Sequence, residues 1–106
     1  PIIDPLVIAR GVDPYRPGKR TLTALASHYG VRQGQAHSAD GDALTAARIV
    51  WAMARRCTLI QSFTLAQLQQ WQRDAHKDWA EGFQKYLRKT NPAAVIDADW
   101  PIRRAA

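Results

Sequence analysis

The sequence predicts a mostly α-helical chain with one short N-terminal strand, and this chain is expected to be part of a larger α/β fold. Three segments after residue 20 carry apolar residues at helical spacing, each behind a residue that can cap a helix. Residues 1–10 differ, because their apolar residues are nearly continuous. Such a run is typical of a central parallel strand that helices cover on both faces. No partner strand is visible downstream, so we expect the rest of the sheet to lie upstream of Pro1.

Composition limits the possible classes of protein. The chain has 106 residues, 46% of them apolar, which suits one domain or part of one. No apolar run approaches the roughly 18 residues of a membrane span, so no membrane partner is expected. The single cysteine, Cys57, excludes an internal disulfide framework, and no signal peptide opens the chain, which favours a cytoplasmic location. The net charge of +6 favours a polyanionic partner.

The first two helices follow from capping signals. Thr21 is a suitable N-cap for a short helix, and Gly30 supplies its left-handed end. Ser38 is the expected cap of the next helix, which continues to about Cys57. Small residues dominate its predicted buried face, which would allow close packing against a sheet. That face comprises Ala43, Ala46, Ala47, Val50, Met53, Ala54 and Cys57.

A long third helix is predicted from Thr64 to about Lys89, and it would span nearly 40 Å. The two shorter helices cannot cover that length, so we expect part of it to pack on an absent segment or on a second copy in a homodimer. An apolar cluster in the tail, which includes Trp100, is expected to dock back on the body. We therefore expect two parts of the chain: residues 1–62, with the strand and the two shorter helices, and residues 63–106, with the long helix and the tail.

One pair of residues points to catalytic chemistry: His37 precedes Asp42 by five residues at the start of a predicted helix. If the histidine lies in the loop and the carboxylate on the first turns, both can face one cleft. Carboxylate oxygens hold Mg²⁺ or Mn²⁺, and a neutral imidazole can take a proton from a metal-bound water. The pattern therefore suits two-metal hydrolysis of a phosphodiester.

The segments around this pair resemble the C-terminal half of a DnaQ-like 3′–5′ exonuclease domain of the DEDDh type, which has an RNase H-like fold. The resemblance covers roughly residues 2–56. It is carried by Asp4-Pro5-Leu6, Pro17-Gly18-Lys19-Arg20-Thr21-Leu22, Leu25, Tyr29-Gly30-Val31 and His37-x-Ala39-x-x-Asp42-Ala43.

The resemblance implies that His37 is the general base and Asp42 a ligand of two Mg²⁺ or Mn²⁺ ions. It also implies hydrolysis at the 3′ ends of single-stranded DNA or RNA. The family's Asp-x-Glu motif is absent, since the only glutamate is Glu81, and a further motif aspartate is also missing. We therefore expect an N-terminal half to complete the site, and this chain to be inactive alone.

Simpler readings of the same residues stay open. His37 and Asp42 could be a surface histidine and a carboxylate that complements a helix dipole. Lys19 and Arg20 could contact a phosphate backbone or lie in a solvated loop. Arg55 and Arg56 end a helix, where positive charge is favourable without any ligand. The alternative function is a non-catalytic helical module for nucleic-acid binding or dimerisation.

Overall fold

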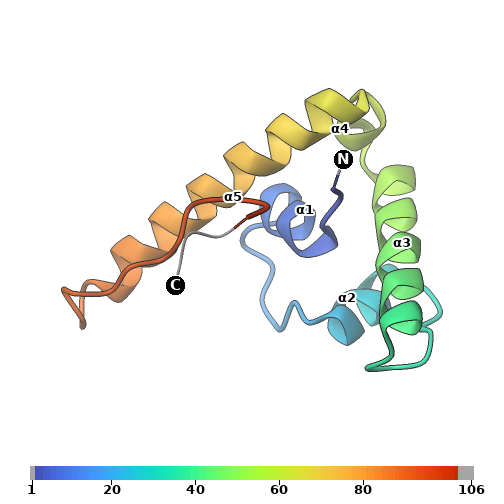
Figure 1. Ribbon diagram of the computed structural model, residues 1–106, viewed down its shortest axis with the longest axis horizontal. Helices are drawn as coiled ribbons and strands as arrows, with labels where there is room; N and C mark the ends of the chain where they lie inside the picture. The colour runs from blue at the N-terminus through green and yellow to red at the C-terminus, as the bar shows by residue number, and fades with distance from the viewer. Residues whose placement is uncertain (1, 103–106) are drawn as a thin grey trace.

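The computed structural model describes residues 2–102, which form five α-helices and no β-strand (Figure 1). The long helices α3 (Ala39–Arg56) and α5 (Leu65–Leu87) are two arms that meet at the short α4 (Thr58–Gln61). Helix α1 (Pro5–Val12) lies in the angle between the arms, and α2 (Leu22–Tyr29) lies beside the N-terminal half of α3. The prediction of a mostly helical chain is confirmed. Residue 1 of the first predicted range, 1–62, and residues 103–106 of the second, 63–106, lie outside the described part of the chain.

The predicted N-terminal strand is wrong, because residues 5–12 form helix α1. Asp4 caps this helix through its carboxylate, which accepts the backbone N–H of Leu6 at 3.0 Å, and Pro5 occupies the first turn. The apolar run is continuous because neighbouring elements surround the helix, so that Val7 and Ile8 are both buried. Ile2 and Ile3, which a central strand would bury, are half exposed.

The three other predicted helices are confirmed, together with their N-caps. Thr21 accepts the N–H of Ala24 at 3.2 Å, and Gly30 ends α2 in the left-handed conformation, with φ of 67°. Thr64 begins α5 with a reciprocal pair of hydrogen bonds to Gln67. Helix α5 ends at Leu87, two residues before the predicted end.

Within residues 2–102, no helix is both long enough and apolar enough to cross a membrane.

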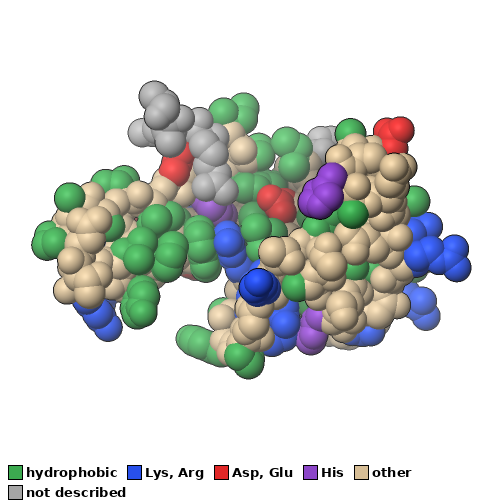
Figure 2. Space-filling view, turned by 90° about the horizontal axis from the view of Figure 1, so that it is seen from below, with side chains coloured by type: hydrophobic (Ala, Val, Ile, Leu, Met, Phe, Trp, Pro, Cys, Tyr) green, Lys and Arg blue, Asp and Glu red, His purple; other side chains and the backbone are tan. Residues whose placement is uncertain are grey.

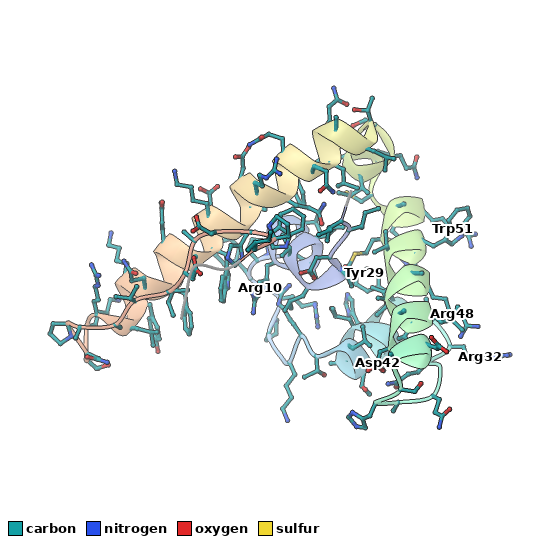
Figure 3. All side chains as sticks on the ribbon, in the orientation of Figure 1. Arg10, Tyr29, Arg32, Asp42, Arg48 and Trp51 are labelled. Atoms are coloured by element: carbon teal, nitrogen blue, oxygen red, sulfur yellow. The ribbon has the colours of Figure 1, made fainter. Side chains whose placement is uncertain are left out.

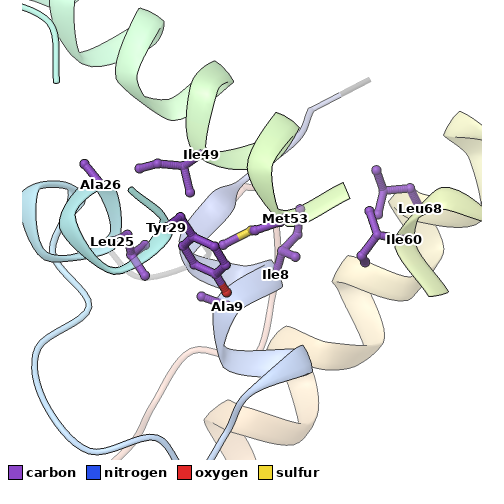
Figure 4. Packing of buried hydrophobic residues seen from close by; sticks show 9 residues of the cluster. All are labelled: Ile8, Ala9, Leu25, Ala26, Tyr29, Ile49, Met53, Ile60 and Leu68. Carbon is purple, nitrogen blue, oxygen red and sulfur yellow. The ribbon is translucent and has the colours of Figure 1, made fainter. Parts of the chain in front are cut away.

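All five helices contribute to one hydrophobic core, shown in Figure 4. The core residues are Ile8, Ala9, Leu25, Ala26, Tyr29, Ile49, Met53, Ile60 and Leu68. On α3 the predicted face is only partly right. Met53 is buried as expected, but Ala43 and Ala47 are exposed, while Thr45 and Ile49 are fully buried. The helix packs on α2 and α1 instead of on a sheet, and these neighbours select a face turned from the predicted one.

Both ends of the described chain are attached to α5. The buried Gln72 side chain accepts the N–H of Asp4 at 2.8 Å and donates to the Ile2 carbonyl at 3.0 Å. The tail returns along the helix, where His76 Nε2 bonds to the Asp97 carbonyl at 2.9 Å and buried Trp100 donates to Asp4 at 3.4 Å. The tail thus covers part of the helix length that we expected to pack on an absent segment or on a second copy.

The outer end of α5 keeps apolar side chains in contact with solvent. Phe83 and Tyr86 are both exposed, as is Leu65 at the other end of the helix. Arg10 from α1 covers a more central aromatic residue, with its guanidinium 3.6 Å from the ring centre of Trp79. Pairing of α5 with a second copy of the chain stays a prediction.

Candidate functional site

The loop between α2 and α3, which carries His37, is attached to α3 by the buried hydroxyl of Thr45. This hydroxyl accepts the N–H of Gly34 at 2.8 Å and donates to the carbonyl of Gly41 at 2.8 Å. A buried hydroxyl that both donates and accepts leaves no unpaired polar atom. Thr45 therefore sets where the loop lies relative to the first turns of α3.

Two glycines allow the loop to approach α3 this closely. A Cβ atom on Gly34 would lie 2.7 Å from the carbonyl oxygen of Gly41, and one on Gly41 would lie 2.7 Å from the backbone nitrogen of Gln35. The predicted cap at Ser38 is confirmed: its Oγ accepts the N–H of Gly41 at 3.0 Å and donates to the Gln35 carbonyl at 2.9 Å. Loop and helix start are thus a single packed unit.

The structure brings His37 and Asp42 together at this unit. The backbone N–H of His37 donates to Asp42 Oδ1 at 3.3 Å, and Asp42 is half-buried in the first turns of α3. The backbone of His37 is left-handed, with φ of 65°, which is uncommon for a residue other than glycine. Its side chain is exposed. The bond and the backbone conformation fix where the backbone of His37 lies relative to the Asp42 carboxylate.

The donor set around Asp42 does not form a complete metal centre. Hard cations such as Mg²⁺ take about six oxygen ligands, several of them from water and phosphate. Among residues 2–102 there is no group of three or more His, Cys, Asp or Glu side chains that could hold a metal ion. Asp42 could supply one carboxylate, but the described residues do not fit a two-ion centre by themselves.

The other two predicted binding residues, Lys19 and Arg20, differ in environment. Lys19 is exposed. The Arg20 guanidinium is turned inward, where it donates to the carbonyls of Ala9 at 2.8 Å, Arg16 at 3.2 Å and Asp13. These bonds attach the C-terminal end of α1 to the loop before α2, so Arg20 has a structural role. A contact of either residue with nucleic acid stays a prediction.

The structure also shows a basic groove that sequence reasoning did not identify as a site. The groove has a volume of about 790 Å³ and lies along the outer side of α3. Figure 2 shows Lys and Arg side chains gathered at the end of the molecule that α3 forms. We call this site the arginine groove, after Arg32, Arg48, Arg55 and Arg56 in its lining. The lining is completed by Tyr29, Gly30, Val31, Ala47, Trp51 and Ala52.

Hydrogen bonds to backbone carbonyls hold two of these arginines in position. Arg48 donates to the carbonyl of Arg32 at 2.9 Å, and Arg56 donates to the carbonyl of Tyr29 at 3.0 Å. Trp51 lies between them on the helix surface and is 69% exposed. A signal was present in the sequence, since positions 48, 51 and 55 share one face of a helix. This face forms the groove only together with Arg32, which the fold brings alongside α3.

Tyr29 lines the arginine groove, and the ionisation of its phenol at high pH provides a test of whether this side chain is buried. Burial raises the pKa of its phenol above the ordinary value, the charge of Asp13 adds to this, and nearby arginines oppose it. The folded state therefore holds the phenol proton more tightly than the unfolded state does. This stabilisation is complete below the ordinary pKa of about 10 and is lost as the pH rises through the folded-state pKa.

We expect Tyr29→Phe to lose less stability than the unmodified chain between about pH 8 and pH 11. The measurement is the free energy of urea unfolding at both pH values. Tyr15→Phe is the matched control, because Tyr15 is 94% exposed and its replacement should leave the alkaline loss unchanged. An equal alkaline loss in Tyr29→Phe and the unmodified chain would contradict the expectation.

Comparison with known proteins identifies no relative of this chain. The chain matches no protein-family model, no curated protein and no solved structure. Membership of the DnaQ-like exonuclease family therefore stays an expectation that rests on the residues of the chain.

Proposed function

We propose that this chain supplies the histidine and one carboxylate of the active site of a 3′–5′ exonuclease, within an RNase H-like α/β domain of the DEDDh type. The observation that carries the proposal is the hydrogen bond from the His37 backbone to Asp42, made in a left-handed turn. Such a conformation is unfavourable for a non-glycine residue by roughly 1 kcal/mol or more, and it occurs preferentially at functional sites. The residue pattern His-x-Ala-x-x-Asp gives independent support.

In this proposal His37 is the general base. Its exposed ring can reach a water molecule beside the terminal phosphodiester of a bound strand. The ring takes a proton from this water while the water oxygen bonds to phosphorus. The bond from phosphorus to the 3′ oxygen of the shortened strand breaks, and that oxygen takes a proton from solvent. The product is a nucleoside 5′-monophosphate, and the substrate is a 3′ end of single-stranded DNA or RNA.

The role proposed for Asp42 is limited to one ligand of the Mg²⁺ or Mn²⁺ ions. Further carboxylates are needed, and we propose that they come from a segment upstream of residue 1. The same segment would supply the strands of the sheet, because residues 2–102 contain none. We place this activity in the cytoplasm, where a single unpaired thiol such as Cys57 stays reduced.

The test uses a longer protein that contains this chain together with its upstream segment. We expect His37→Asn to lower 3′–5′ exonuclease activity by about 100-fold to 10,000-fold, as removal of a general base does. Asparagine tolerates the left-handed backbone, so the loop should keep its conformation. Release of mononucleotides from a 3′-labelled single strand measures activity, and circular dichroism checks folding.

His28→Asn is the matched control, since His28 is exposed on α2, outside the loop that carries His37. Full activity in His37→Asn would refute the assignment of the base. The 106-residue chain alone should release no mononucleotides with either metal ion. Metal-dependent degradation by this chain would show that the additional carboxylates are not required.

A further inference from the structure

We propose that the arginine groove binds single-stranded nucleic acid, with its guanidinium groups on the phosphates and Trp51 stacked on a base. The groove is separate from the His37–Asp42 pair. Trp51 follows Asp42 by nine residues, which is about two and a half helical turns, so the two side chains leave opposite faces of α3. Figure 3 shows Arg48 and Trp51 pointing away from α1. Binding at this groove therefore does not depend on the proposed hydrolysis.

The charge of the groove favours a polyanion. Its lining contains four arginines and no acidic residue, and among residues 2–102 none of the four forms an ion pair. Each guanidinium has five N–H donors, and the carbonyl bonds of Arg48 and Arg56 occupy only part of them. Four like charges along one groove repel each other, and a bound chain of phosphates would relieve this repulsion.

Helix-dipole effects do not account for this arrangement. Arg55 and Arg56 lie in the last turn of α3, where positive charge is favourable without a ligand. Arg48 lies in the middle of the helix, and its guanidinium is held at Arg32 instead. The dipole also gives no reason for a large exposed indole between the arginines.

The exposed indole of Trp51 favours a single strand over a duplex. An exposed indole can stack on a base only when that base is unpaired and accessible. Arg48 and Arg55 are seven residues apart, or about 10 Å along the helix axis. Trp51 lies between these two arginines on the same face of α3, so one strand could contact both arginines and pass Trp51.

The test measures binding of the 106-residue chain to a fluorescein-labelled oligothymidylate of about a dozen nucleotides, by fluorescence anisotropy in EDTA. We expect binding at low salt that weakens as salt is raised. Arg48→Gln combined with Arg55→Gln should lower the slope of log K against log salt by about 1.4, or 0.7 per lost phosphate contact. Trp51→Ala should weaken binding about tenfold, and Trp51→Phe should restore most of it.

The matched control combines Arg73→Gln with Lys77→Gln, which removes the same charge from the exposed surface of α5. This control should keep the original salt slope. Equal losses in the two double variants would overturn the proposal, because binding would then follow net charge alone. The proposal also fails if Trp51→Ala binds normally, if no binding occurs at low salt, or if polyglutamate or phosphatidylserine vesicles bind as tightly as the oligonucleotide.

Discussion

Gly41→Ala is expected to lower the free energy of unfolding by about 2 to 3 kcal/mol, although alanine is the better helix former. The added methyl group would overlap the carbonyl oxygen of Gln35 and would lie 2.6 Å from Ser38 Oγ. The overlap with backbone cannot be relieved by a change of rotamer. The loop must move away from α3, which would break the hydrogen bond from Gly34 to Thr45 and displace His37 from Asp42.

Urea unfolding followed by circular dichroism measures this change, and Gly82→Ala is the matched control. Gly82 lies on the exposed side of α5, and a methyl group there would meet no atom within 4 Å. The control should therefore gain about 0.5 to 1 kcal/mol from helix propensity. If Gly41→Ala were stabilised to the same extent, the close approach of loop and helix would be wrong.

Ile49→Ala is expected to lower the free energy of unfolding by about 3 kcal/mol. Ile49 is fully buried in the core among α1, α2 and α3 (Figure 4), so truncation would leave a cavity in addition to the lost burial. The urea midpoint should fall by roughly 2 M for a chain of this size. The core at this point joins three successive helices.

Leu44→Ala is the control for this substitution, because Leu44 is on the same helix but 46% exposed. Its replacement should change the free energy of unfolding by about 0.5 kcal/mol at most. Equal destabilisation by the two substitutions would contradict the observed orientation of α3. It would instead favour a rotated helix in which the alanine-rich face predicted from the sequence is buried.

The helix boundaries could be predicted because their signals are local. Thr21, Ser38 and Thr64 each cap a helix through a backbone N–H three residues away, so the sequence contains both partners of the bond. Asp4 and Pro5 form a similar local signal for α1, yet the continuous apolar run that follows favoured a strand. The run alone could not distinguish the two, since a helix surrounded by neighbours also buries consecutive residues.

The candidate site, like the helices, could be predicted only in part. The spacing of His37 and Asp42 placed them on a loop and the following helix, and the structure joins them by a hydrogen bond. The inward orientation of Arg20 could not be predicted, because its acceptors include the carbonyl of Ala9, eleven residues earlier in the chain. The arginine groove was missed for a related reason: Arg32 and Arg48 meet only when α2 packs on α3.

The sequence by itself therefore determined where most helices begin and end and that His37 lies beside Asp42, since both depend on groups within a few residues of each other. The tertiary structure decided that the apolar N-terminal run is a helix, which face of α3 is buried, and that four arginines and Trp51 share one groove. Each of these depends on the elements that pack alongside, and burial is decided by contacts between segments far apart in the chain.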